Sequence, residues 1–304
     1  MESSMATLTR KLKKEKVIRT TREKICHEIV FVIFVIYAFT LIYPFFFLLM
    51  NSFKADIIEM REFPLRFPQV FYNGKGELIA FDSYKKALEM EVKGANILGM
   101  FFNTVTLSIG QTFVSMALTC MSAYTLAKYR FKGNGLIYTI ILICSVVPTF
   151  GAEASMFNLM TNILPLRNTY IGMLVMCGGF GASFLYLHSF FKEIPWSYGE
   201  SAMIDGASDF RIFLQIMLPL AKNGVMVFTI MKFMGFWNDY WTPYLYYEDY
   251  PTLAVGLTML EDLPEVSTST FFAATILCIL PALALYAALS DKLMGNLSAG
   301  GIKG

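Results

Sequence analysis

Long apolar runs without a single charged side chain set the class of fold that this chain can adopt. Ile29–Met50 and Val266–Ser290 contain no Asp, Glu, Lys or Arg. About 20 consecutive apolar residues are enough for a helix to cross the hydrocarbon core of a bilayer. Only 16% of the 304 residues are charged, whereas a soluble domain carries roughly a quarter. The sequence therefore predicts an all-α, multi-pass membrane protein in contact with lipid.

Six membrane-spanning helices follow from the same criterion. The predicted spans are residues 29–50, 94–127, 133–152, 168–191, 220–245 and 266–290. Five of them are free of charge. The fifth in chain order is less certain from hydropathy alone, because Lys222, Lys232 and Asp239 interrupt it.

Lys and Arg in the short loops predict the orientation, because cytoplasmic loops carry an excess of these residues. Residues 1–28 are rich in bases, and the loop after the second span holds Lys128, Arg130 and Lys132 with no acid. Residues 248–265 contain five acids and no base. We therefore expect both tails, 1–28 and 291–304, and the loop 192–219 to lie in the cytoplasm.

The transmembrane domain then covers residues 29–290, with an extracytoplasmic loop at 54–93. A basic tail could instead bind nucleic acid, but bases directly before a span favour the topological interpretation, and no nucleic-acid partner is predicted. The first span is too long, and lacks the small-residue cleavage site, for a removable signal peptide. We expect it to remain in the membrane.

The sequence predicts neither a metal site nor a nucleotide-binding site in this chain. The five cysteines are scattered and form no CxxC pair, and His27 and His188 are isolated, so neither a disulfide framework nor a metal site is predicted. The glycines of Cys177–Ala182 follow no strand and favour close helix packing or local flexibility over a dinucleotide loop. The chain has no GxxxxGK[ST] motif, so any energy from ATP must come through another chain.

The segment Glu200–Leu220 is charged and amphipathic, although apolar spans surround it. A first helix is expected from Pro195 to about Ile204, since proline suits the first helical turn. Gly206 can adopt the positive φ that ends such a helix. A second helix is expected to start at Ser208 as its N-cap, with Asp209 at the positive end of its dipole.

The second helix of this loop is predicted to bury one apolar face. Phe210, Phe213, Leu214 and Met217 fall at positions i, i+3, i+4 and i+7, the spacing of one helical face, and Pro219 marks a break before the next span. Glu200 and Asp205 would remain available to a soluble partner. An amphipathic loop that packs only on its own bundle is the alternative, and these residues leave both interpretations open.

The same segment resembles the EAA motif of type I ABC importer permeases, E-A-A-x-x-x-D-G-A followed by a later proline. The spacing is that of the carbohydrate branch, and Ser201 replaces the first alanine. The other matching positions are Glu200, Ala202, Asp205, Gly206, Ala207, Phe210, Phe213 and Pro219.

The resemblance extends over nearly the whole chain. Further similar motifs are Asn103-Thr104, Ser122–Lys132 with Gly133, Asn168-Thr169, Trp237-Asn238-Asp239 and the end Ser298–Gly304. Each motif is weak by itself. Their order and spacing make the resemblance specific.

The resemblance implies a maltose-transporter-type permease fold with six transmembrane helices in a bacterial inner or plasma membrane. Such a subunit pairs with a homologous second permease, two cytoplasmic ATPases that bind ATP and Mg²⁺, and an extracytoplasmic solute-binding protein. It is not itself an enzyme and binds no cofactor. It forms half of the pathway for a sugar or oligosaccharide, and its ATPase-coupling residues would be Glu200, Ser201, Ala202, Asp205, Gly206, Ala207, Phe210 and Phe213.

Residues of the translocation pathway are expected on the fifth span. The candidates are Lys232, Trp237, Asn238, Asp239 and Trp241. Lys232 replaces an apolar residue usual in the family and would lie about 18 Å into the membrane. A lysine facing lipid there costs on the order of 2.5–3.5 kcal/mol, so we expect it to face the bundle interior. A structural role, satisfied by carbonyl groups or by the companion permease, is the alternative.

The tryptophans leave two interpretations open as well. They could stack on sugar rings, or anchor the helices at the membrane interface, where aromatic residues are common. The sequence leaves three other functions open: a permease for a non-sugar solute, a membrane-embedded glycan or lipid enzyme, and a stand-alone secondary transporter. The enzyme would need clustered carboxylates or histidines at one face, and the transporter would be expected to show inverted repeats.

Overall fold

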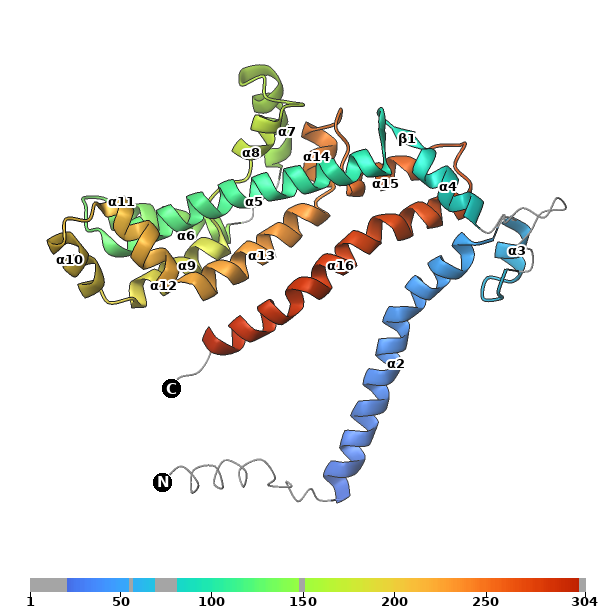
Figure 1. Ribbon diagram of the computed structural model, residues 1–304, viewed down its shortest axis with the longest axis horizontal. Coiled ribbons are helices and arrows are strands. Elements are labelled where there is room, and N and C mark those ends of the chain that lie inside the picture. The colour runs from blue at the N-terminus through green and yellow to red at the C-terminus, as the bar shows by residue number, and fades with distance from the viewer. Residues whose placement is uncertain (1–20, 55–56, 69–80, 148–150, 301–304) are drawn as a thin grey trace.

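The computed structural model describes residues 21–54, 57–68, 81–147 and 151–300, which fold into helices and one short β-hairpin (Figure 1). The first elements are α2 Thr21–Ser52, α3 Ile57–Glu62, α4 Asp82–Glu89, β1 Glu91–Val92, β2 Ala95–Asn96, α5 Ile97–Lys128, α6 Asn134–Val146, α7 Ala152–Asn158 and the π-helix η3 Leu159–Ile163. The remaining elements are α8 Tyr170–Val175, α9 Ala182–Glu193, α10 Ser197–Ile204, α11 Asp209–Ile212, the π-helix η4 Phe213–Met217, α12 Leu218–Leu220, α13 Lys222–Asn238, α14 Trp241–Tyr246, α15 Leu253–Glu261 and α16 Thr268–Gly300.

Helix α5 contacts elements at both ends of the molecule. It runs between an end that carries α4, β1 and α15 and an end that carries α10 and α11 (Figure 1). Asn96 begins the helix, because its side-chain oxygen accepts a hydrogen bond from the Gly99 amide at 2.9 Å. After the helix ends, the Asn134 amide donates to the carbonyls of Leu126 and Tyr129. Gly133 makes this return possible with φ of +94°.

Three helices in the described part of the chain are long and apolar enough to cross a membrane. They are Lys24–Ser52 of α2, α5, and Thr268–Ala288 of α16. A fourth results if the pair Asp209–Leu220 and Lys222–Asn238, bent by 84°, is counted as one span. The prediction of a helical membrane protein is confirmed, while six spans remain a prediction.

The fourth predicted span, residues 168–191, is not one continuous helix. Helix α8 ends at Val175 and α9 begins at Ala182, and between them Gly178 and Gly181 have φ of +53° and +119°. A Cβ on Gly179 would lie 2.7 Å from the Cβ of Leu118 on α5. The glycines therefore break the helix and also let α5 approach closely.

Other predicted spans differ from the structure at their ends. In the third, α6 ends at Val146, and residues 148–150 lie outside the described residues. The fifth ends at Asn238 rather than near residue 245, because the Asp239 carboxylate accepts the Thr242 amide at 3.1 Å and starts the separate helix α14. Helix α16 continues ten residues beyond the predicted end at residue 290.

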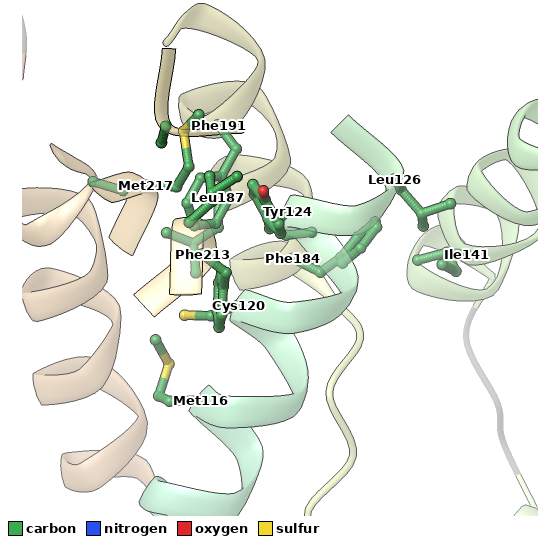
Figure 2. Close-up of a cluster of buried hydrophobic side chains, with 14 residues drawn as sticks. Met116, Cys120, Tyr124, Leu126, Ile141, Phe184, Leu187, Phe191, Phe213 and Met217 are labelled. Carbon is green, nitrogen blue, oxygen red and sulfur yellow. The ribbon is translucent and has the colours of Figure 1, made fainter. Parts of the chain in front are cut away.

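Buried side chains form separate clusters along α5. Figure 2 shows the cluster near the end that carries α10, where Tyr124 of α5, Phe191 of α9 and Phe213 of η4 gather. A second cluster, which includes Met100 and Trp237, joins α5 and α13 to α15 and α16 near the opposite end. The two cores fix α5 near both of its ends.

Polar contacts tie the loops together at the end that carries β1. Lys93 and Arg167 donate to the two carboxylate oxygens of Glu248 at 2.8 and 2.9 Å. The hydrogen bond from Lys93 holds the pKa of Glu248 below its ordinary value. Asn103 and Thr104 of α5 bind the carbonyl of Pro251 and the amide of Leu253, at 3.1 and 2.8 Å.

Candidate coupling site and translocation pathway

Helix α10 forms where the sequence predicts the first helix of the loop. It begins at Ser197, two residues after the predicted start at Pro195, with Trp196 as its N-cap, and it ends at Ile204. A Cβ on Gly199 would lie 2.9 Å from the Trp196 ring. Glycine at this position lets the indole pack directly against the helix backbone.

The end of α10 is a Schellman motif. The amide of Gly206 donates to the Met203 carbonyl at 3.0 Å, and that of Ala207 donates to the Ala202 carbonyl at 2.9 Å. Gly206 has φ of +79° with no atom near its Cβ position. The predicted positive φ at Gly206 is confirmed, and backbone conformation rather than space is the reason for glycine.

The predicted second helix begins at Asp209, with Ser208 in the extended N-cap conformation. The Ser208 side chain makes no capping hydrogen bond. The Asp209 carboxylate accepts a hydrogen bond from the Tyr129 hydroxyl at 2.9 Å. The contact connects the loop to the end of α5, which sequence spacing did not reveal.

The predicted apolar face of this helix is buried only in part, at Phe213 and Met217. The regular helix ends at Ile212 and a π-helix, η4, continues to Met217. The wider turn buries Ile212, Phe213 and Met217, whereas Phe210 remains 63% exposed and Leu214 is exposed as well. A π-turn shifts the direction of every following side chain, which a 3.6-residue period cannot anticipate.

The candidate coupling residues divide into two groups. Exposed members that can meet a partner are Glu200, Ser201, Asp205, Gly206 and Phe210. Ala202 and Phe213 are buried in the cluster of Figure 2, and Ala207 packs at its edge. The buried members shape the loop rather than its outer surface.

Sequence reasoning missed three apolar side chains on α10. Tyr198, Met203 and Ile204 are exposed, and Ile204 is the most exposed of them at 87%. The available signal was that the three lie close together in a charged segment. Exposed apolar patches of this kind mark contacts with proteins or membranes.

Lys232 points into the helix bundle, as predicted. Its ammonium group donates to the Ser115 hydroxyl of α5 at 2.7 Å. Ser115 in turn donates to the carbonyl of Gly178 at 2.7 Å, in the break between α8 and α9. Lys232 is half-buried, so it is partly satisfied and partly accessible.

The other predicted pathway residues separate into two groups. A hollow of about 480 Å³ brings together Lys232, Gly235, Phe236, Asn238 and Asp239. Trp237 is buried against Phe101 and Phe233 instead. Trp241 lies exposed beyond the end of α13 and stacks on Tyr244.

The described residues include no group of three His, Cys, Asp or Glu side chains that could hold a metal ion. The described part of the chain thus combines helices long enough to cross a membrane with a hollow at Lys232 and a short exposed helix, α10, at one end.

Comparison with known proteins places the chain in a family. Residues 115–294 match the family of the binding-protein-dependent transport system inner membrane component. This match covers more than half of the chain, and the protein therefore belongs to that family. Its members are transport subunits rather than enzymes.

Curated relatives align over most of the chain. The diacetylchitobiose uptake system permease protein NgcG of Streptomyces coelicolor is 29% identical over 88% of this chain and 85% of its own length. The galactooligosaccharides transport system permease protein GanQ of Bacillus subtilis is 30% identical over 74% of this chain and 80% of its own. The maltodextrin transport system permease protein MalD of Streptococcus pneumoniae is 29% identical over 87% and 91%.

A solved structure has the same fold. The chain resembles a subunit in the crystal structure of a bacterial ABC transporter involved in the import of the acidic polysaccharide alginate, with a TM-score of 0.73. The alignment covers 90% of this chain and 98% of the other, at 20% identity.

Proposed function

We propose that this protein forms half of the transmembrane pathway of an ATP-driven, binding-protein-dependent importer for a sugar or oligosaccharide. The relatives NgcG, GanQ and MalD carry the names of saccharide transport systems, which supports this substrate class. The companions are a homologous permease, two cytoplasmic ATPases and an extracytoplasmic solute-binding protein. ATP and Mg²⁺ bind to the ATPases.

The orientation belongs to the same proposal. Six spans place residues 1–28, the loop 192–219 and residues 291–304 in the cytoplasm of a bacterial inner or plasma membrane. The loop 54–93 and the cluster around Glu248 then face outside. The basic loop after α5 and the acidic loop before α16 support this arrangement.

The exposed apolar surface of α10 is the observation that carries the proposal. Helix α10 lies at one end of the molecule (Figure 1). Its side chains Tyr198, Met203 and Ile204 are exposed, and so are those of Glu200 and Asp205. An apolar patch rimmed by acids fits a cleft on an ATPase that offers apolar walls and basic side chains. Burial of such a patch gives most of its energy through a few central residues.

The fold suits mechanical coupling. Helix α10 is braced by the core that also holds α5, α9 and η4 (Figure 2). When the ATPases close on ATP, they displace α10, and packed helices respond as rigid bodies rather than by continuous deformation. The polar hollow at Lys232, Asn238 and Asp239 is the proposed segment of the sugar pathway.

Replacement of the exposed apolar side chain of Ile204 by a charged one tests the proposal. We expect Ile204→Glu to reduce recovery of the ATPases with the affinity-purified permease by about tenfold or more, because a central interface residue contributes about 2 kcal/mol. Uptake of radiolabelled maltodextrin or diacetylchitobiose by cells that express the full system should fall in parallel. Phe67→Glu is the matched control, because Phe67 is 70% exposed but lies in the loop after α3.

Equal recovery of the ATPases with both variants would contradict the role of α10. Recovery of wild-type permease without any ATPase would contradict the importer assignment itself. Uptake of neither saccharide by a complex that assembles normally would leave the coupling role intact and contradict the choice of these sugars.

A further inference from the structure

The structure assigns to Tyr129 a positioning role: its hydroxyl fastens the loop 192–219, here called the coupling loop, to α5 and passes displacement of α10 into the membrane-spanning helices. This inference rests on the proposed function of α10. It concerns a side chain outside the EAA-like segment, at the turn that follows α5.

Tyr129 contacts the loop on both sides of α10. Its hydroxyl donates to the carboxylate of Asp209 at 2.9 Å, at the start of α11. Its ring meets that of Trp196 edge to face, with the centroids 5.7 Å apart. Trp196 is the N-cap of α10 and packs over Gly199. One side chain thus holds the residue before α10 and the residue that opens the helix after it.

The neighbouring residue strengthens the same connection. Lys128, the last residue of α5, donates from its ammonium group to the carbonyl of Ile194, three residues before α10 begins. Lys128 and Tyr129 are followed by the return turn that Asn134 holds in place. The end of α5 therefore grips the loop at Ile194, Trp196 and Asp209.

Asp209 determines the direction of the hydrogen bonds in the series Tyr124, Tyr129 and Asp209. Asp209 accepts when ionised, so the Tyr129 proton goes to its carboxylate. The hydroxyls of Tyr124 and Tyr129 lie 3.2 Å apart, and the Tyr124 hydroxyl must then be the donor. Burial, followed by the contacts with Tyr124 and Asp209, raises the pKa of Tyr129, which keeps this proton in place.

This hydrogen-bonded series, from Asp209 through Tyr129 to Tyr124, is here called the relay, and it leads from the surface into the core. Tyr124 is 4% exposed and its ring lies 5.0 Å from that of Phe213 and 5.7 Å from that of Phe191 (Figure 2). Asp209 lies at the exposed end of the relay. A displacement of the loop is therefore applied directly to a buried part of α5.

Tyr129→Phe removes the hydroxyl and retains the ring. The test uses the complete complex in lipid nanodiscs, with hydrogen exchange measured with and without ATP plus orthovanadate. In the wild type, trapping should change exchange in residues 198–207 and in residues 125–134. In Tyr129→Phe, the change at 198–207 should persist while that at 125–134 falls about fivefold, the factor expected for one lost hydrogen bond.

Two further variants separate this bond from general loosening. Asp209→Ala should reproduce the effect, and the double variant should be no worse than either single one, because both remove the same interaction. Asp209→Asn keeps an acceptor and should retain most of the response. Tyr186→Phe is the matched control, since Tyr186 is exposed and its ring stacks on Phe228.

The hydrogen-exchange results distinguish failure of the Tyr129 inference from failure of the proposed coupling function. A wild-type response at 125–134 in Tyr129→Phe overturns the inference, and so does loss of both changes, which would mean that Tyr129 supports the fold or ATPase docking. If the wild-type complex itself shows no response at 198–207, the proposed coupling function fails, and the inference fails with it. Only that last outcome is visible without any substitution.

Discussion

Two glycines of the coupling loop are required for different physical reasons. Gly206 needs its backbone freedom, because φ is +79° and its Cβ position is empty. Gly199 needs its small size, because the Trp196 ring occupies the space where a Cβ would lie. A substitution at either position disturbs α10, but through strain in one case and through displacement of an aromatic ring in the other.

Gly206→Ala tests the conformational requirement. A non-glycine residue in the left-handed region costs roughly 1–2 kcal/mol, so we expect a lower thermal unfolding midpoint and reduced saccharide uptake. Gly135→Ala is the control, because its Cβ position is also empty but it lies within α6 without a positive φ. It should leave both measurements unchanged or slightly improve stability. Equal effects of the two variants would contradict the conformational explanation.

Short-range sequence signals predicted the backbone conformation of this site but not the contacts between distant residues. The positive φ of Gly206 follows from a glycine after the last helical residue, which is a short-range signal. The bond from Tyr129 to Asp209 joins residues 80 positions apart, and no spacing rule relates them. The exposed apolar side chains Tyr198, Met203 and Ile204 lie close together in the sequence, and that grouping was the available signal.

At the scale of elements, the break between α8 and α9 shows how Lys232 is satisfied within the helix bundle. The break between α8 and α9 leaves the Gly178 carbonyl without a helical partner, and the hydroxyl of Ser115 reaches it. Lys232 binds the same hydroxyl. In the proposed six-span arrangement the break lies at membrane depth, where irregular backbone is stable only if protein or a polar cavity satisfies it.

Lys232→Met separates structural support from a role in the pathway. Ser115 keeps its bond to Gly178 in this variant, so assembly with the ATPases should persist. Loss of a charged hydrogen-bond donor from the polar hollow should change the transport KM about tenfold, or alter the preference among saccharides. The control is Lys222→Met, at the exposed start of the same helix. Wild-type kinetics and preference in Lys232→Met would leave a structural role alone.

Hydropathy located the apolar segments but not their interruptions. Its window averages over residues 168–191, whereas the break depends on positive φ at Gly178 and Gly181. The π-helix at Phe213–Met217 is likewise set by packing against Tyr124 and Phe191 rather than by local propensity. Composition therefore predicted a helical membrane protein with long apolar segments, while the interruptions within those segments depend on tertiary contacts.

At the scale of the whole molecule, α5 connects two fixed ends. Its 32 residues span about 48 Å at 1.5 Å per residue, which exceeds the hydrocarbon core of about 30 Å. Asn103 and Thr104 fasten its first part to the loop before α15. Lys128 and Tyr129 fasten its other end to the loop around α10. In the proposed orientation, displacement at the cytoplasmic end of α5 can therefore reach its other end through a single helix.

The arrangement of the two ends across the membrane is the last prediction. Single cysteines introduced at Glu89 and Glu200, in a variant whose five native cysteines are replaced, place exposed thiols on α4 and α10. The native residues must be removed because Cys26 and Cys144 are exposed. In intact cells, a membrane-impermeant maleimide should label position 89 and spare position 200. Position 200 should react after the membrane is opened, which shows that its thiol is accessible. Labelling of position 200 in intact cells would place α10 outside, where no ATPase could reach it, and would contradict the coupling mechanism as a whole.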